Sequence, residues 1–183
     1  RRRFNVTEYY RMAEIGLLHE DDHVELINGE LIQMCAIGAK DGECVGSLGE
    51  LMIALMGSQY RVRVQNPVHL SDATEPEPDL VVAHRRSYRQ AHPTAGDICF
   101  LVEVADTSLN YDVGIKLPLY AAAGIAEVFI VDTIHDLVER HTEPRDGEYQ
   151  RVVRAGRGES LTSTVLPAVT FPVDVALGYE LPA

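Results

Sequence analysis

Two acidic residues in this sequence adjoin or interrupt apolar segments, where a charged side chain needs a partner. Glu103 lies within FLVEVAD, in which the other residues from 100 to 105 are all apolar, and Asp79 directly precedes the apolar run 80–82. A buried carboxylate is unfavourable by several kcal/mol unless it is paired or binds a cation. If two strands bring both acids to one end, the carboxylates repel each other unless a cation lies between them. Oxygen ligands of this kind favour Mg²⁺, so the pair predicts a site for Mg²⁺ or Mn²⁺.

Each acid also has a purely structural interpretation. Glu103 is equally consistent with a pair to an arginine or lysine, or with a position at a strand end that faces solvent. Asp79 is a suitable turn residue after Pro78 in EPEPDLVV. The two prolines of that segment lack an amide hydrogen and fix φ, so they exclude a helix or a strand interior and place Asp79 where a strand begins.

Two further residues are candidates for the same site. Lys116 lies in an apolar helical segment, with Asp112 and Tyr120 one turn to either side on one helix face. A lysine in such a helix can point inward, although an exposed pair with Asp112 is the alternative. Glu25 stands between Val24 and Leu26 in a predicted strand and faces away from both by alternation, which alone is a weak signal.

Charge argues against tight, non-specific binding of nucleic acid. The net charge is −12, with 28 acidic and 16 basic residues, whereas nucleic-acid-binding domains tend to be basic. A local basic patch or a bound cation changes the field at the site itself. The dense basic segment HRRSYRQAH supplies Arg85, Arg86 and Arg89 as candidate phosphate contacts, and its alternative is a solvated loop.

The totals predict one folded domain over residues 1–183. The chain is 46% hydrophobic and 24% charged, and its apolar runs are shorter than the about eighteen residues of a membrane span. The N-terminal residues do not resemble a signal peptide. Cys35, Cys44 and Cys99 are odd in number and form no CxxC motif, so we expect reduced thiols and a cytoplasmic location.

The order of predicted elements is typical of an α/β fold with a mixed sheet, helices on its faces and additional β-hairpins. Alternating apolar residues around Asn28-Gly29 and around Asp146-Gly147 predict hairpins, because such dipeptides favour two-residue turns. The proline-containing tail is expected to be irregular. The other expected helices are one capped by Thr7 and ending near Gly16, one over 45–55, and one over 108–124 that bends or begins late at Pro118 and ends at Gly124. The other expected strands are one or two over 60–68, broken at Pro67, and one each over 79–84, 98–106 and 126–132.

Four ordered motifs resemble a known family. VELINGEL, EPEPDLVV, LVEVADTS followed by D…K…Y, and AAAGIAEVFIVD are similar to the Uma-type family of predicted bacterial endonucleases, within the PD-(D/E)XK, restriction-endonuclease-like superfamily. The resemblance runs from about residue 4 to about residue 175. It implies a restriction-endonuclease-like fold and Mg²⁺-dependent hydrolysis of nucleic acid, most simply DNA. Asp79, Glu103 and the main-chain carbonyl of Val104 correspond to the metal ligands, with Glu25 as the additional acid.

The sequence departs from the pattern at two positions. The superfamily lysine normally stands two residues after the glutamate, where this chain has Ala105, and Lys116 on the following helix resembles a relocated substitute. The family usually has a histidine before its second helix, where this chain has Asp41, which leaves activity open. The resemblance implies that Lys116 orients the attacking water or stabilises charge on the phosphate.

A second class of function also fits the sequence. The acidic net charge and Asp41 favour a catalytically silent protein that keeps a nuclease scaffold as a binding module, whereas Glu25, Asp79, Glu103 and Lys116 favour the enzyme. The segment FIVDTIHDLVERH is expected to form a hairpin that adds strands to a second copy, so we expect a homodimer.

Overall fold

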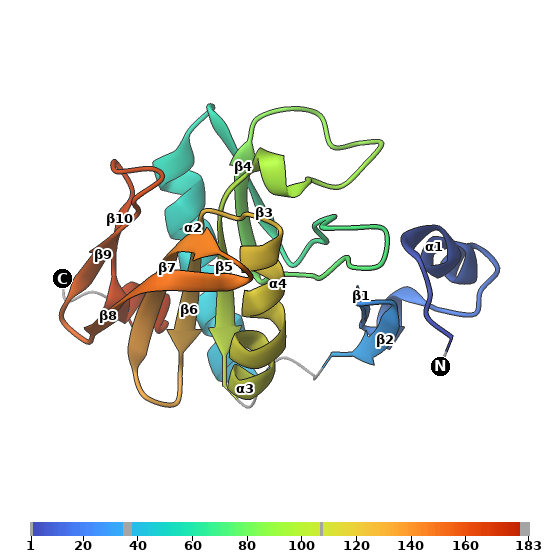
Figure 1. The fold of residues 1–183 in the computed structure, drawn as a ribbon. Helices are drawn as coiled ribbons and strands as arrows, with labels where there is room; N and C mark the ends of the chain where they lie inside the picture. The colour runs from blue at the N-terminus through green and yellow to red at the C-terminus, as the bar shows by residue number, and fades with distance from the viewer. Residues whose placement is uncertain (1, 35–37, 107, 180–183) are drawn as a thin grey trace.

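The fold centres on a six-stranded mixed sheet, seen in a computed structural model that describes residues 2–34, 38–106 and 108–179 (Figure 1). The strand order is β3-β4-β5-β6-β7-β8, and only β5 and β6 run parallel. Two-stranded sheets, β1-β2 and β9-β10, are added to it. The strands are β1 Val24–Ile27, β2 Glu30–Gln33, β3 Tyr60–Val64, β4 Leu80–His84, β5 Ile98–Ala105, β6 Glu127–Asp132, β7 Leu137–Arg145, β8 Glu148–Gly156, β9 Ser160–Thr162 and β10 Thr170–Pro172.

Helices cover both faces of the sheet, as the sequence predicts. In Figure 1, α4 stands in front of the sheet and α2 lies behind it. No helix among the described residues is long and apolar enough to cross a membrane. The α-helices are α1 Val6–Glu14, α2 Ala39–Met56, α3 Leu109–Tyr111, α4 Leu117–Ala122 and α5 Val173–Ala176; short 3-10 turns cover Glu20–Asp22 and Ala95–Asp97, and a π-helical turn covers Asp112–Lys116.

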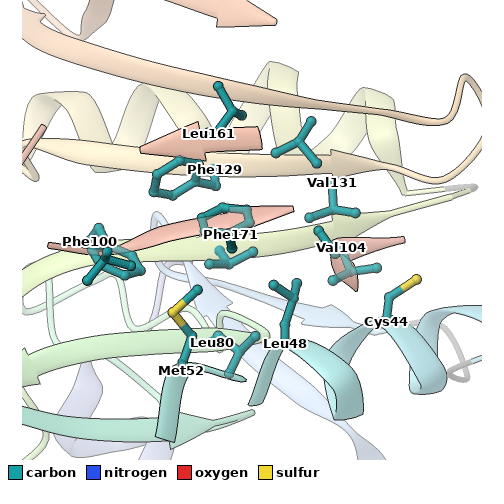
Figure 2. Close-up of a cluster of buried hydrophobic side chains, with 14 of the residues drawn as sticks. Cys44, Leu48, Met52, Leu80, Phe100, Val104, Phe129, Val131, Leu161 and Phe171 are labelled. Carbon is teal, nitrogen blue, oxygen red and sulfur yellow. The ribbon is translucent and has the colours of Figure 1, made fainter. Parts of the chain in front are cut away.

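The larger core lies between the sheet and α2. Leu48 and Met52 of α2 pack there with strand residues and with Phe171 of β10 (Figure 2). Phe129 makes edge contacts with Phe100 and Phe171, at ring-centroid distances of 5.5 and 5.0 Å. Such aromatic pairs add about 0.5–1.5 kcal/mol to the burial of their area. This core holds β4 and β5 rigidly side by side, which matters for the acids at their ends.

Both predicted hairpins are present. Asn28 and Gly29 have φ of 50° and 78°, and Asp146 and Gly147 have φ of 52° and 78°. Positive φ at both central residues is the type I′ turn that matches the twist of the flanking strands. The first hairpin docks on the chain before β4, because the amide of Glu75 donates to the carbonyl of Leu26 at 2.7 Å. This contact brings β1, and with it Glu25, toward the end of the sheet.

The predicted helix over 108–124 is present, and a π turn over Asp112–Lys116 replaces regular α-helical geometry just before Pro118. α3, the π turn and α4 follow one another without a break, and Pro118 lies in the first turn of α4. Gly124 has φ of 80° just beyond the last turn, the left-handed conformation that ends helices.

Three sequence expectations were wrong in part. α1 is capped by Asn5, whose side chain accepts from the Glu8 amide at 2.8 Å, and not by Thr7, because Asn5 and Glu8 form a reciprocal capping box. The expected strand ends at Val64, since Gln65 has φ of 48°. The tail is partly regular, because Phe171 is fully buried and pairs with Leu161 across β9 and β10.

Cys44 and Cys99 are buried free thiols, and burial raises the pKa of each to about 11. Cys35 lies outside the described residues.

Candidate active site

Asp79 and Glu103 stand opposite each other where β4 begins. Leu80 pairs with Val102 in the antiparallel β4–β5 ladder, so the next position of the same register places Asp79 against Glu103. Their side chains reach across in both directions. Asp79 Oδ2 accepts from the Val104 amide at 2.8 Å, and Glu103 Oε2 accepts from the Asp79 amide at 3.4 Å. The structure therefore brings together two acids that are far apart in sequence.

Lys116 lies among the acids and not at the surface. Its Nζ is 3.0 Å from Glu103 Oε1, 3.6 Å from Glu25 Oε2 and 3.9 Å from Asp112 Oδ1. Only 5% of Lys116 is exposed, and Asp112, its partner one turn earlier, is as deeply buried. The interpretation of Lys116 and Asp112 as an exposed surface pair is therefore wrong. Lys116 enters the cluster from the π turn, a helical irregularity that is frequent at functional sites.

Tyrosines and main-chain groups hold the remaining oxygens in place. The Tyr120 hydroxyl donates a short hydrogen bond to Glu103 Oε1. The Tyr111 hydroxyl donates to Glu25 Oε1 at 2.9 Å, and the Glu77 amide donates to Glu25 Oε2 at 3.0 Å. Glu25 and Glu103 are each 2% exposed. Two helical tyrosines thus orient the two most deeply buried carboxylates of the cluster.

Burial dominates the electrostatics of these acids. Burial raises the pKa of Glu103, and the nearby negative charges of Asp112 and Asp79 raise it further. The Lys116 ammonium lowers this pKa, and the net result is a value of about 8. The pKa values of Asp79 and Asp112 are also raised, chiefly by burial. The carboxylates of Glu103, Glu25 and Asp112 raise the pKa of Lys116 despite its burial, so Lys116 is a cation at neutral pH.

Asp41 lies in the first turn of α2 and contributes negative charge to the same region. Its Oδ1 is buried and has no hydrogen-bond partner among the described residues. Burial raises the pKa of Asp41, and the charge of Asp106 raises it further. The charge of Asp41 in turn raises the pKa of Asp79.

The donor set fits a hard divalent cation by its chemistry. Glu25, Asp79, Glu103 and Asp112 supply carboxylate oxygens, and Lys116 is the cation that lies among them. A divalent ion bound there would favour the ionised form of these acids, against the burial that chiefly raises their pKa values. In the described part of the chain no three histidine, cysteine or acidic side chains are grouped closely enough to hold a metal ion by themselves. A metal would therefore need main-chain oxygen or water in addition to the Asp79 and Glu103 side chains.

The structure places the three loop arginines away from this cluster. Arg85, Arg86 and Arg89 follow β4, whereas Asp79 precedes it. All three are exposed. They line a hollow beside the sheet edge, together with two arginines of β3.

Sequence reasoning missed Tyr111 and Gln65, which both contact the acids. Tyr111 lies five residues before Lys116. In a regular α-helix two residues at this spacing face different sides, and the π turn between them brings both side chains to the same side. The side-chain Nε2 of Gln65 donates to Asp79 Oδ1 at 3.4 Å, and the main-chain amide of Gln65 donates to the Asp79 carbonyl at 2.9 Å. The polar residue that directly follows the alternating β3 segment was the available signal for Gln65.

The chain matches one family in sequence pattern and one solved structure in fold. The Uma2 family model, described as "Putative restriction endonuclease", matches residues 6–175. A crystal structure of a "putative nuclease belonging to DUF820" from Anabaena variabilis aligns with a TM-score of 0.74 and 12% identity, over 95% of this chain and 97% of that one, which shows a shared fold. A DrdV–DNA complex aligns at a TM-score of 0.37 and 15% identity, over 58% of this chain and 9% of that one, too distant for any argument. No curated protein matches the chain.

Proposed function

Because the chain belongs to the Uma2 family, we propose that it is a nuclease that hydrolyses phosphodiester bonds of nucleic acid with the help of a divalent cation. One observation carries the proposal: Asp79 and Glu103 are held face to face across β4 and β5, with the Lys116 ammonium beside them. Several acids buried together are unfavourable for folding unless a cation compensates their charge. Clusters of this kind are frequent at functional sites.

Asp79 and Glu103 are the proposed metal ligands, with the main-chain carbonyl of Val104. Mg²⁺ or Mn²⁺ bound there would lower the pKa of a water molecule and offset charge on the phosphate. Glu25 would hold a water of that ion's shell, or a second ion. Its two hydrogen bonds, from the Tyr111 hydroxyl and the Glu77 amide, fix its carboxylate for this role.

Lys116 is suited to electrostatic work and not to proton abstraction. Its raised pKa keeps it protonated, so it can donate to a phosphate oxygen or orient the attacking water. In the reaction, a water oxygen bonds to phosphorus and releases a proton to solvent. The bond from phosphorus to the sugar oxygen breaks, and that oxygen takes up a proton. The Tyr120 hydroxyl keeps Glu103 in position through its hydrogen bond.

DNA is the proposed substrate, and Arg85, Arg86 and Arg89 are its proposed phosphate contacts. These arginines are exposed in a chain whose net charge is −12, so they offer phosphate a local region of opposite charge. We also propose a homodimer. The segment FIVDTIHDLVERH, expected to add strands to a second copy, forms β6 and β7, which are interior strands already paired on both sides, so that expectation was wrong. The free edge is strand β8, whose unpaired ladder groups a second copy can pair with.

A catalytically silent scaffold is the second candidate, and the position of Lys116 is the observation that favours it. An ammonium that already pairs with Glu103 and Glu25 can neutralise the acids without a metal ion. In that case the acidic cluster would only stabilise the fold, and the protein would bind a partner through its surface.

Cleavage of supercoiled plasmid DNA, with Mg²⁺ or Mn²⁺ and with EDTA, separates the two candidates. We expect nicking with either metal, no nicking in EDTA, and at least about 100-fold slower nicking in Asp79→Asn and in Glu103→Gln. Glu127→Gln is the matched control, because Glu127 is a fully buried carboxylate of β6 that bonds Ser163 and Thr164 outside the cluster. A folded protein that neither cuts DNA or RNA nor binds Mn²⁺ decides for the scaffold.

A further inference from the structure

A hollow of about 470 Å³ lies beside edge strand β3, at the end of β4 remote from Asp79. Its rim combines two strand arginines with the loop that follows β4. The lining residues are Arg61, Arg63, Arg85, Arg86, Ser87, Tyr88 and Arg89. Five of the 16 lysines and arginines of the chain therefore surround one small space.

The positive charge of this hollow is largely uncompensated. Arg86 pairs with Asp97 at 2.6 Å, and the other four arginines have no carboxylate partner among the described residues. Burial lowers the pKa of Arg63, and the charge of Arg61 lowers it further. Like charges held together in this way favour the binding of an anion between them.

Among the described residues, Arg63 is the arginine of this hollow that has an unpartnered buried donor. Its Nε is buried and has no hydrogen-bond partner within the described part of the chain. Its Nη2 donates to Asn66 Oδ1 at 3.1 Å and lies 3.2 Å from His92 Nδ1, so its other neighbours are uncharged side-chain groups or groups of its own sign. Arg63 also lines the hollow, so a phosphate bound there can accept charge-assisted hydrogen bonds from its guanidinium group.

Tyr88 organises the guanidinium groups. The Arg63 and Arg86 guanidinium carbons lie 5.7 and 5.1 Å from the centre of its ring. Its hydroxyl donates to the His84 carbonyl at 2.7 Å, which anchors the ring to the end of β4. Arginines ordered on an aromatic ring lose less freedom when they bind a ligand.

The hollow and the acids share one face of the sheet. Arg63 pairs with Val81 and Arg61 with Ala83 in the β3–β4 ladder, so each arginine lies on the same face as its partner. Val81 belongs to the core under α4, and Asp79 shares its face by alternation. Measured along the strands, Arg63 and Arg61 lie two and four residues, or about 7 and about 13 Å, from Asp79, and β3 is offset from β4 by about 5 Å. Successive phosphates rise about 3.4 Å along a duplex axis and are further apart along the backbone, so these arginines lie within about four nucleotides of Asp79.

We propose that Arg61 and Arg63, with the arginine loop around Tyr88, bind backbone phosphates within about four nucleotides of the bond that is cut. This subsite rests on the proposed nuclease function and deepens it. An acidic protein segment is the competing occupant, and the experiment below distinguishes it.

The test measures binding of fluorescein-labelled DNA by anisotropy in EDTA, where cutting is not required. Arg61→Gln/Arg63→Gln should weaken binding at least 10-fold and reduce the salt dependence by one to two phosphate contacts, about 0.9 in log-log slope for each contact. Arg145→Gln/Arg151→Gln removes the same charge from exposed residues of the far hairpin β7–β8 and should weaken binding less than 2-fold. Arg85→Gln/Arg89→Gln, at exposed loop positions, gives the same test if the strand variant fails to fold.

Neutral methylphosphonate linkages locate the contact. On a DNA with a defined cutting site, one such linkage placed in turn at each of the first four nucleotides should at one of these positions weaken binding by the wild type, and have no further effect on Arg61→Gln/Arg63→Gln. Equal weakening by the strand, loop and control variants overturns the subsite, and so does preferential binding of a poly-glutamate peptide at these arginines. Plasmid cutting with Mn²⁺ is scored separately, so loss of the subsite and loss of nuclease function remain distinguishable.

Discussion

Replacement of Glu103 by glutamine should remove a pH dependence of folding stability that the carboxyl group imposes. Glu103 is 2% exposed, and its pKa is raised to about 8, chiefly by burial. In the unfolded chain a glutamate has its ordinary pKa near 4.5. Between these two values the folded protein keeps a proton that the unfolded chain releases, so stability falls as pH rises.

The size of the effect follows from the two pKa values of Glu103. Folding raises the pKa of Glu103 from 4.5 to about 8. At about 1.4 kcal/mol per pKa unit, the folded state therefore disfavours the ionised carboxylate relative to the protonated acid by about 5 kcal/mol. The contribution is fully present below about pH 4.5 and is lost as pH rises through about 8. Between pH 5 and pH 9 it accounts for about 4 kcal/mol, or about 8–16 °C in Tm for a chain of this size.

The assay is equilibrium urea unfolding at pH 5, 6, 7, 8 and 9 in EDTA, for the wild type and Glu103→Gln. The stability of the variant relative to the wild type should increase steadily over this series. Asp174→Asn is the control, because Asp174 bonds Arg157 and the Gly158 amide at the surface, and its pKa is lowered. Its contribution is complete above the ordinary aspartate pKa and is lost only at lower pH, so its difference from the wild type should be constant from pH 5 to 9. A constant difference for Glu103→Gln as well would refute the assignment of a buried, proton-binding carboxyl at this position.

Three other changes test the cluster and the hairpin that closes it. Lys116→Met leaves buried acids without their cation and should lower the free energy of unfolding by about 3–5 kcal/mol in urea at pH 8, and an unchanged midpoint would contradict the ion pairs. Mn²⁺ at 100 times its Kd should stabilise the wild type by about 2.7 kcal/mol in thermal melts at pH 8, whereas Asp79→Asn and Glu103→Gln should show no such gain, and equal gains would disprove these ligands. Gly29→Ala should destabilise the fold by about 1–3 kcal/mol in urea, because Gly29 has φ of 78° and an added Cβ would lie 2.9 Å from a backbone carbonyl; a neutral result would contradict that close approach.

The strands that carry the acids could be predicted because local patterns specify them. The apolar run around Glu103 and the prolines before Asp79 each mark a strand boundary without reference to the rest of the chain. The turn dipeptides Asn28-Gly29 and Asp146-Gly147 likewise specify both hairpins. These signals depend on backbone sterics and side-chain alternation, which act within a few residues.

Features that depend on distant partners could not be predicted. Phe171 forms β10 because it fills the core beside Phe129, and a short proline-containing tail gives no local sign of that contact. Arg61 and Arg63 alternate along β3, which does place them on one face, but their proximity to the loop arginines follows only from the β3–β4 register. The cap at Asn5 was missed for a local reason, since Asn5 and Glu8 form a capping box that competes with Thr7.

The π turn explains how one helix directs three polar side chains into the site. In a regular α-helix each step of four residues overshoots a full turn by about 40°, so two steps would carry Tyr120 about 80° away from Asp112. The π turn over Asp112–Lys116 is wider than an α-helical turn and takes up part of that overshoot. Tyr120 therefore reaches Glu103 while Lys116 contacts both Glu103 and Asp112. Ala105, on the same face of β5 as Glu103, is fully buried and carries no charge, so the helix and not the strand supplies the cation. The irregular turn thus allows one helix to bring Asp112, Lys116 and Tyr120 to the same acids.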